Sequence, residues 1–213
     1  TRKLRRGVRP IDQEPASVAC PVDGYVSQAG PLAGDSLLQA KGISYSAGAL
    51  LGDDPMLAAQ FAGGAFATLY LAPHNYHRIH MPLAGTLRLA RHVPGDLFSV
   101  NAVSADGVPG LFARNERIAC VFDTTAGPMA VVLVGALFVG SMSLSWAGEI
   151  RGERPRVMRD LPARPMIALD KGAELGWFNM GSTVILMFAA AGPALVPGLA
   201  PGRPVRMGER IAT

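Results

Sequence analysis

The chain has 213 residues, of which 49% are hydrophobic and 17% charged, and its formal net charge at pH 7 is +4. So apolar a chain can offset the entropy cost of ordering, which excludes intrinsic disorder, and the length fits one domain or two small ones. The 20 Lys and Arg residues are spread along the sequence, which argues against nucleic-acid binding, and two cysteines, Cys20 and Cys120, cannot form a disulfide framework.

The N-terminal segment is basic. No apolar run follows it, so it is not a signal peptide. It is either a solvated arm or a contact for anionic lipid headgroups, near which each basic group contributes about 1 kcal/mol. Because the first residue is Thr, we expect the natural N-terminus to lie upstream. The basic residues are Arg2, Lys3, Arg5, Arg6 and Arg9.

An internal repeat follows. Pro21-x-Asp23-Gly24-x-Val26 recurs as Pro82-x-Ala84-Gly85-x-Leu87, and Gly34-Asp35 recurs at the same offset as Gly95-Asp96. Gly and Asp suit tight turns, because Gly adopts positive φ and Asp hydrogen-bonds locally. Each copy therefore predicts a turn, a short strand, a loop and a second turn.

The second turn of each copy should lead into a further strand, at Leu37-Leu38 and at Leu97-Phe98. Paired half-motifs of this kind resemble barrel-sandwich hybrids. With 25 Gly and 17 Pro favouring short strands, we predict a mostly β fold (β-rich α+β) with a barrel-sandwich-hybrid-like antiparallel core and one or two short helices. The copies differ where Asp23 is replaced by Ala84, which indicates that Asp23 does more than shape a turn.

Residues 46–61 carry the helical pattern. Leu50, Leu51, Leu57 and Phe61 are spaced for one face, and Pro55 interrupts them. Since Pro is tolerated in the first turn of a helix, we predict two short helices, the second starting at Pro55.

Three of the four histidines lie within seven residues, at His74, His77 and His80. On a helix the first and last would lie far apart, and on a strand His77 would face away from the other two. No further ligand motif completes a metal site, so we expect no metal. The histidines are then catalytic, or they are ordinary surface and packing residues.

Residues 124–148 and 175–202 contain no Asp, Glu, Lys or Arg and are long enough to be candidate membrane spans. Gly and Pro interrupt both. We therefore predict buried strands at residues 131–134 and 137–139 and a half-buried strand at residues 141–146. In the second stretch, Ser182 is not part of a Gly-x-Ser-x-Gly motif, which argues against an α/β-hydrolase nucleophile.

Together these motifs resemble the phosphatidylserine decarboxylases, a family of self-cleaving proenzymes that make their own pyruvoyl cofactor. The resemblance covers nearly the whole chain. Met180 departs from the family's usual Leu, a swap that conserves volume. The matching blocks are Gly7-Val8-Arg9-Pro10-Ile11, Pro21-Val22-Asp23-Gly24, Leu38-Gln39-Ala40-Lys41-Gly42, Tyr76-His77-Arg78-Ile79-His80-Met81-Pro82, Pro94-Gly95-Asp96-Leu97-Phe98-Ser99-Val100-Asn101, Phe112-Ala113-Arg114-Asn115-Glu116-Arg117, Val134-Gly135-Ala136 and Gly181-Ser182-Thr183.

The resemblance implies two stages of chemistry. In the first, an Asp23–His80–Ser182 triad activates the Ser182 hydroxyl to attack the Gly181 carbonyl. The resulting ester breaks down to a β chain of residues 1–181 and an α chain of residues 182–213, which remain associated, with Ser182 converted to the pyruvoyl group. In the second, the pyruvoyl forms a Schiff base with phosphatidylserine, carbon dioxide leaves, and phosphatidylethanolamine is released. His77 is the candidate for proton transfer or for positioning the carboxylate.

The resemblance also implies a carboxy-lyase of phospholipid biosynthesis, in one catalytic domain over residues 1–213. It implies a covalent pyruvoyl group derived from Ser182, with no metal and no pyridoxal phosphate. The implied partners are phosphatidylserine and an anionic membrane surface on the cytoplasmic side, where the enzyme is peripheral, and a homo-oligomer is one possible state. The N-terminal membrane-associating region of long-form members is absent from this sequence.

Two alternatives stay open. One is a pyruvoyl decarboxylase of another serine-derived amine, which would have a closed polar pocket. The other is a non-catalytic barrel-sandwich carrier or binding module. A carrier needs a lysine at a hairpin tip, and neither Lys41 nor Lys171 lies in a suitable turn.

Overall fold

The computed structural model describes residues 3–5, 7–137, 141–151, 156–162, 165–179 and 182–213. Strands make up 44% of the chain and helices 11%, and the strands pair antiparallel, which confirms the predicted mostly β fold. Within the described residues the strand pairings form open paths and not a closed barrel.

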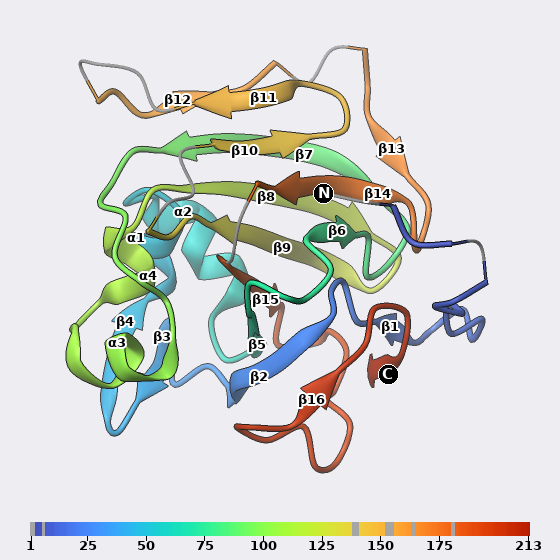
Figure 1. Ribbon diagram of the computed structural model, residues 1–213, viewed down its shortest axis with the longest axis horizontal. Coiled ribbons are helices and arrows are strands. Elements are labelled where there is room, and N and C mark those ends of the chain that lie inside the picture. The colour runs from blue at the N-terminus through green and yellow to red at the C-terminus, as the bar shows by residue number, and fades with distance from the viewer. Residues whose placement is uncertain (1–2, 6, 138–140, 152–155, 163–164, 180–181) are drawn as a thin grey trace.

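A nine-stranded sheet forms the centre of the molecule (Figure 1). The short strand β13 (Ala168–Leu169) also pairs with β7 at one margin of this sheet. In spatial order, the other strands are β12 (Arg159–Asp160), β7 (Gly85–Val93), β8 (Arg117–Thr124), β9 (Gly127–Val134), β15 (Ser182–Phe188), β5 (Ala65–Leu71), β2 (Gly24–Pro31) and β16 (Pro204–Val205).

A four-stranded sheet accompanies the large one, and two short ribbons complete the strands. In Figure 1, β11 lies at the opposite end of the molecule from β16. The four-stranded sheet has the order β11 (Gly148–Arg151), β10 (Ser141–Leu144), β14 (Glu174–Phe178) and β6 (Arg78–His80). The ribbons are β1 (Val18–Ala19) with β17 (Arg210–Ala212), and β3 (Ser36–Ala40) with β4 (Ile43–Ser46).

The charge-free stretches supply the centre of the large sheet. Every residue of β15 is buried, and it lies between β9 and β5 in continuous register. A strand covered on both faces reads as an uninterrupted apolar run, which is why the sequence resembled a membrane span. The predicted strands at residues 131–134 and 141–146 are confirmed as parts of β9 and β10, but β10 ends at Leu144 and all four of its residues are buried, so the predicted half-burial is wrong. None of the described helices is long and apolar enough to cross a membrane.

The internal repeat is visible in the fold. β2 begins at Gly24 and β7 at Gly85, the equivalent glycines of the two copies. The predicted strand after Gly34-Asp35 is confirmed as β3, but the one at Leu97-Phe98 is wrong. Asn115 explains the difference, because its side chain accepts from the Phe98 amide at 3.0 Å and donates to the Phe98 carbonyl at 2.9 Å. The predicted strand at residues 137–139 falls largely outside the described residues.

The two predicted helices are confirmed as α1 (Ala47–Leu50) and α2 (Pro55–Ala58), and a 3₁₀ turn at Ala59–Phe61 extends the second. Ser46 and Asp54 accept hydrogen bonds from the first-turn amides, as N-cap residues do. Two further short helices, α3 (Ala102–Gly107) and α4 (Leu111–Arg114), were not predicted.

Arg117 fastens α1 to the large sheet. Its side chain is buried, and its guanidinium donates to the carbonyls of Leu50 at 2.7 Å and Asn115 at 2.8 Å and also to that of Ala49. Burial lowers the pKa of Arg117 to about 10. Two of these carbonyls lie in α1 and the third belongs to Asn115, so one guanidinium joins the helix to the start of β8.

Arg117→Met should therefore destabilise the protein by about 2–4 kcal/mol, because it removes three hydrogen bonds from a buried guanidinium to backbone carbonyls. The free energy of unfolding in urea measures this loss. Arg114→Met is the matched control. Arg114 is about half exposed, and its loss should cost less than about 1 kcal/mol. Equal losses in the two variants would contradict a structural role for Arg117.

Candidate active site

One end of the large sheet gathers the residues predicted to react. β15 begins at Ser182, which pairs with Leu71 at the end of β5, and β2 begins directly after Asp23 on the other side of β5. Neighbouring strands lie about 4.8 Å apart, which places the backbones of Asp23 and Ser182 about 10 Å from each other.

Gly24 allows Asp23 to lie this close to β5. A Cβ atom added at Gly24 would lie 2.2 Å from the Tyr70 carbonyl oxygen, far inside contact distance. Glycine is therefore required by the close approach of two backbones.

Both histidines of the Tyr-His-Arg-x-His block reach the same end through β6. The His80 amide donates to the Pro21 carbonyl at 2.9 Å, two residues before Asp23. β6 also pairs with β14, and the Phe178 amide donates to the His77 carbonyl at 3.0 Å. Since the chain runs from Phe178 toward Ser182, His77 lies beside the segment that precedes the predicted cleavage point. His74 is exposed.

The imidazole of His80 has a defined tautomer. Its Nδ1 lies 2.8 Å from the Gly172 carbonyl oxygen, which can only accept, so Nδ1 carries the proton. Its Nε2 then accepts from the Tyr76 hydroxyl at 3.0 Å, and the two rings stack with their centroids 5.7 Å apart. With the proton on Nδ1, Nε2 is the ring nitrogen that faces the Tyr76 hydroxyl and can act as an acceptor.

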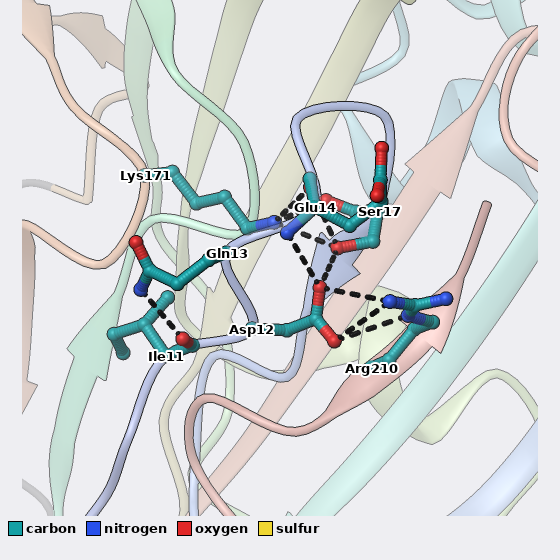
Figure 2. Close-up of polar contacts among 7 residues, drawn as sticks. All are labelled: Ile11, Asp12, Gln13, Glu14, Ser17, Lys171 and Arg210. Atoms are coloured by element: carbon teal, nitrogen blue, oxygen red, sulfur yellow. Dashed lines mark hydrogen bonds and ion pairs between the residues drawn. The ribbon is translucent and has the colours of Figure 1, made fainter.

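A polar cluster anchors the turn that carries Gly172 (Figure 2). The neighbouring Lys171 donates through Nζ to the Glu14 carbonyl at 2.9 Å and to Ser17 at both its carbonyl and its hydroxyl. The Ser17 hydroxyl donates in turn to Asp12. The segment around residues 12–17 is thereby attached to the turn that orients His80, and Arg210 pairs with Asp12 at 3.0 Å.

Asp23 is held by other groups. Its carboxylate accepts from Arg9 Nε at 2.9 Å on one oxygen and from Arg9 Nη2 at 2.7 Å on the other. The Met207 amide also donates to it, at 2.9 Å. The hydrogen bonding and the ion pair between Arg9 and Asp23 raise the pKa of the Arg9 guanidinium above its usual value. Both oxygens of Asp23 are therefore bound to groups other than His80.

Ser182 is fully buried at the first position of β15. Among the described residues its hydroxyl has no hydrogen-bond partner. Leaving a buried hydroxyl without a hydrogen bond costs about 1–3 kcal/mol. Most buried polar groups in folded proteins are hydrogen-bonded, so one without a partner calls for an explanation. Thr183 has the same unpaired burial, but only Ser182 stands at the end of the strand. Gly181 and Met180 lie outside the described residues.

The predicted triad residues Asp23, His80 and Ser182 thus lie at one end of the fold. The side chains of Asp23 and His80, however, hydrogen-bond to other groups and not to each other.

His77 is half-buried, and its Nε2 lies 3.1 Å from the Pro73 carbonyl oxygen, so that nitrogen carries the proton. Its Nδ1 is buried without a partner among the described residues. Burial lowers the pKa of His77, which is therefore neutral at pH 7 with a free acceptor nitrogen.

Three groups of the site had no predicted role. Tyr76 and Arg9 belong to blocks that match the family, so the sequence placed them in the family's motifs but assigned them no role. Gly172 belongs to no such block, and only its contact with His80 identifies it. Within the described residues no group of three or more His, Cys, Asp or Glu side chains could hold a metal ion.

The fold and site define an antiparallel β protein that gathers a buried hydroxyl, two imidazoles and a carboxylate at one end of its main sheet. A family model described as phosphatidylserine decarboxylase matches residues 1–213. The chain belongs to the phosphatidylserine decarboxylase family, as its sequence motifs predicted.

Several curated relatives share this family over the whole chain. A Pseudomonas aeruginosa protein is 55% identical over 215 residues, covering 100% of this chain and 74% of the relative. A Bordetella petrii protein is 54% identical and a Pseudomonas putida protein 52% identical, each with 75% of its own length covered. All three are named phosphatidylserine decarboxylase proenzyme, so the family is one of carboxy-lyases.

Proposed function

We propose that this chain decarboxylates phosphatidylserine to phosphatidylethanolamine, and that it first cleaves itself between Gly181 and Ser182 to make a pyruvoyl group. The observation that carries the proposal is the Ser182 hydroxyl, which is buried, has no hydrogen-bond partner among the described residues, and lies at the end of the fold where Asp23 and both histidines lie. Family membership supports the substrate class.

For self-cleavage, the Ser182 hydroxyl oxygen attacks the Gly181 carbonyl carbon and gives up its proton to His80. The nitrogen of Ser182 leaves as a free amine, so the peptide bond becomes an ester. Elimination then releases the Gly181 carboxylate, and addition of water with loss of ammonia leaves a pyruvoyl group at position 182. His80 suits the base role because its Nδ1 proton is held by Gly172 and its Nε2 is the acceptor. Asp23 is proposed as the carboxylate of the triad from its match to the family block.

The new carbonyl is a good fit for this position, because it would replace a hydroxyl that is already buried and has no partner within the described part of the chain. When present, a pyruvoyl group supplies an electron sink for the electrons left behind as carbon dioxide departs. The substrate amine arrives protonated and must lose that proton before it can react. The free Nδ1 of neutral His77 accepts it, and the same proton returns to the substrate α-carbon after decarboxylation.

The two products of cleavage should stay together. β15 would begin the short chain, residues 182–213, and it is hydrogen-bonded to β5 on one side and β9 on the other. Every one of its side chains is buried. Separation would expose this apolar strand, which the hydrophobic effect opposes. We therefore propose one catalytic domain over residues 1–213, acting as a peripheral enzyme at the membrane where its substrate resides.

The experiment is intact mass of the purified protein under denaturing conditions, before and after borohydride is added with phosphatidylserine. We expect two fragments that break between Gly181 and Ser182, with the smaller one gaining the mass of the reduced lipid amine. An unbroken chain under every condition would contradict self-cleavage and favour a carrier or binding module. Cleavage with trapping of soluble serine but not of phosphatidylserine would favour the other decarboxylase.

A further inference from the structure

A pocket of about 220 Å³ opens beside the imidazole of His80. The N-terminal segment forms one wall through Lys3, Arg5 and Arg9, and Tyr76 and Glu174 line the other side with His80. The basic segment of the sequence therefore lies against the candidate active site.

The pocket carries an excess of positive charge. Glu174 is the acidic residue among its described lining residues, and Arg78 pairs with it at 2.5 Å. Arg9 pairs with Asp23 at 2.7 Å. Each of these two ion pairs is neutral overall. The described lining residues contain no further carboxylate, so the positive charges of Lys3 and Arg5 are not offset. An anion is the ligand that such a wall favours.

Several contacts hold the segment in this place. The Val8 amide donates to the Arg5 carbonyl at 3.2 Å, which closes a turn directly before Arg9 and its pair with Asp23. Leu4 and Arg5 line the same pocket as Tyr76, whose pKa is raised by burial. Tyr76 is in turn hydrogen-bonded to His80. The cationic wall is thereby tied to the catalytic imidazole.

We propose that Lys3 and Arg5 bind the phosphodiester of the substrate headgroup, so that the serine part extends past His80 toward position 182. This subsite rests on the proposed function. In a phosphoserine headgroup only one oxygen and one methylene separate the phosphorus from the α-carbon. The phosphate must therefore bind close to position 182, and the pocket lies beside His80, the proposed base for Ser182.

The kinetic test compares the Lys3→Gln/Arg5→Gln double variant with the parent. The substrates are phosphatidylserine in vesicles that are otherwise phosphatidylcholine, and water-soluble glycerophosphoserine. We expect normal self-cleavage by mass, a KM about tenfold or more higher for both substrates, and a kcat within about twofold, since charge-assisted bonds to the phosphate are lost. Lys41→Gln/Arg151→Gln is the matched control, because both side chains are exposed and the loss of charge is the same.

A KM raised only on vesicles would mean that the segment attracts the enzyme to a membrane surface, and it would overturn the subsite. An unchanged KM for both substrates, or an equal rise in the control, would do the same.

A binding experiment tests the phosphate subsite independently of the proposed self-cleavage and decarboxylation. Uncleaved Ser182→Ala protein retains the pocket, and calorimetry can measure its binding of glycerophosphoserine and of inorganic phosphate. We expect glycerophosphoserine to bind, and its Kd to rise about tenfold or more when Lys3→Gln/Arg5→Gln is added. Binding of inorganic phosphate alone would assign the site to free phosphate and overturn the headgroup subsite. Failure of cleavage or trapping in the parent, with this binding intact, would overturn the proposed function only.

Discussion

Replacing Ser182 by alanine is expected to leave one full-length chain and to reduce decarboxylation by at least about a thousandfold, because no hydroxyl remains to attack the Gly181 carbonyl. The fold should tolerate the change. Ser182 is fully buried and its hydroxyl has no partner among the described residues, so the variant loses no hydrogen bond that they supply. Intact mass and urea unfolding measure the two effects.

Thr183→Val is the matched control for Ser182→Ala. Thr183 is the next residue of β15, is equally buried and also has an unpartnered hydroxyl. Its conversion to valine removes that hydroxyl at nearly constant volume, and cleavage should proceed at the parent rate. A cleaved Ser182→Ala chain, or an uncleaved Thr183→Val chain that is well folded, would disprove the assignment of the nucleophile.

His80→Gln should also remain uncleaved, because glutamine can hydrogen-bond to Gly172 but cannot accept the proton from Ser182. General base catalysis contributes about 10²–10⁴-fold, so the variant should remain uncleaved over the time in which the parent is fully processed. The rate of appearance of the two fragments on a denaturing gel measures this. Processing at the parent rate would exclude His80 as the base.

His77→Gln separates the two stages. It should cleave normally and then decarboxylate about 10²–10³-fold more slowly, since the proposed proton carrier is absent. The required form of His77 is neutral, and burial lowers its pKa below the usual histidine value. Parent activity should therefore persist as the pH falls through about 6.5, and decline only when the lowered pKa is passed. Full activity of this variant, or loss of its cleavage, would contradict the division of roles.

Features set by a few neighbouring residues were predictable from the sequence. The turn glycines Gly24 and Gly85 marked the starts of β2 and β7, and Pro55 marked the start of α2. Local rules of this kind act within one turn or one cap, so the residues that obey them are adjacent in the chain. The strand predicted at Leu97-Phe98 does not form, because a residue outside this local segment bonds to its backbone. Asn115, 17 residues further along the chain, takes the backbone hydrogen bonds of Phe98 that a strand would need.

The sequence by itself determined the β-rich class and the family, and it singled out Asp23, His77, His80 and Ser182 as site candidates, because the blocks that carry them are contiguous. Only the tertiary structure decided what each side chain touches. Gly172 is brought to His80 by the pairing of β14 with β6, and Met207 meets Asp23 across nearly the whole length of the chain. Hydrogen bonds between such distant residues leave no local pattern, because they depend on where the folded sheets place two backbones.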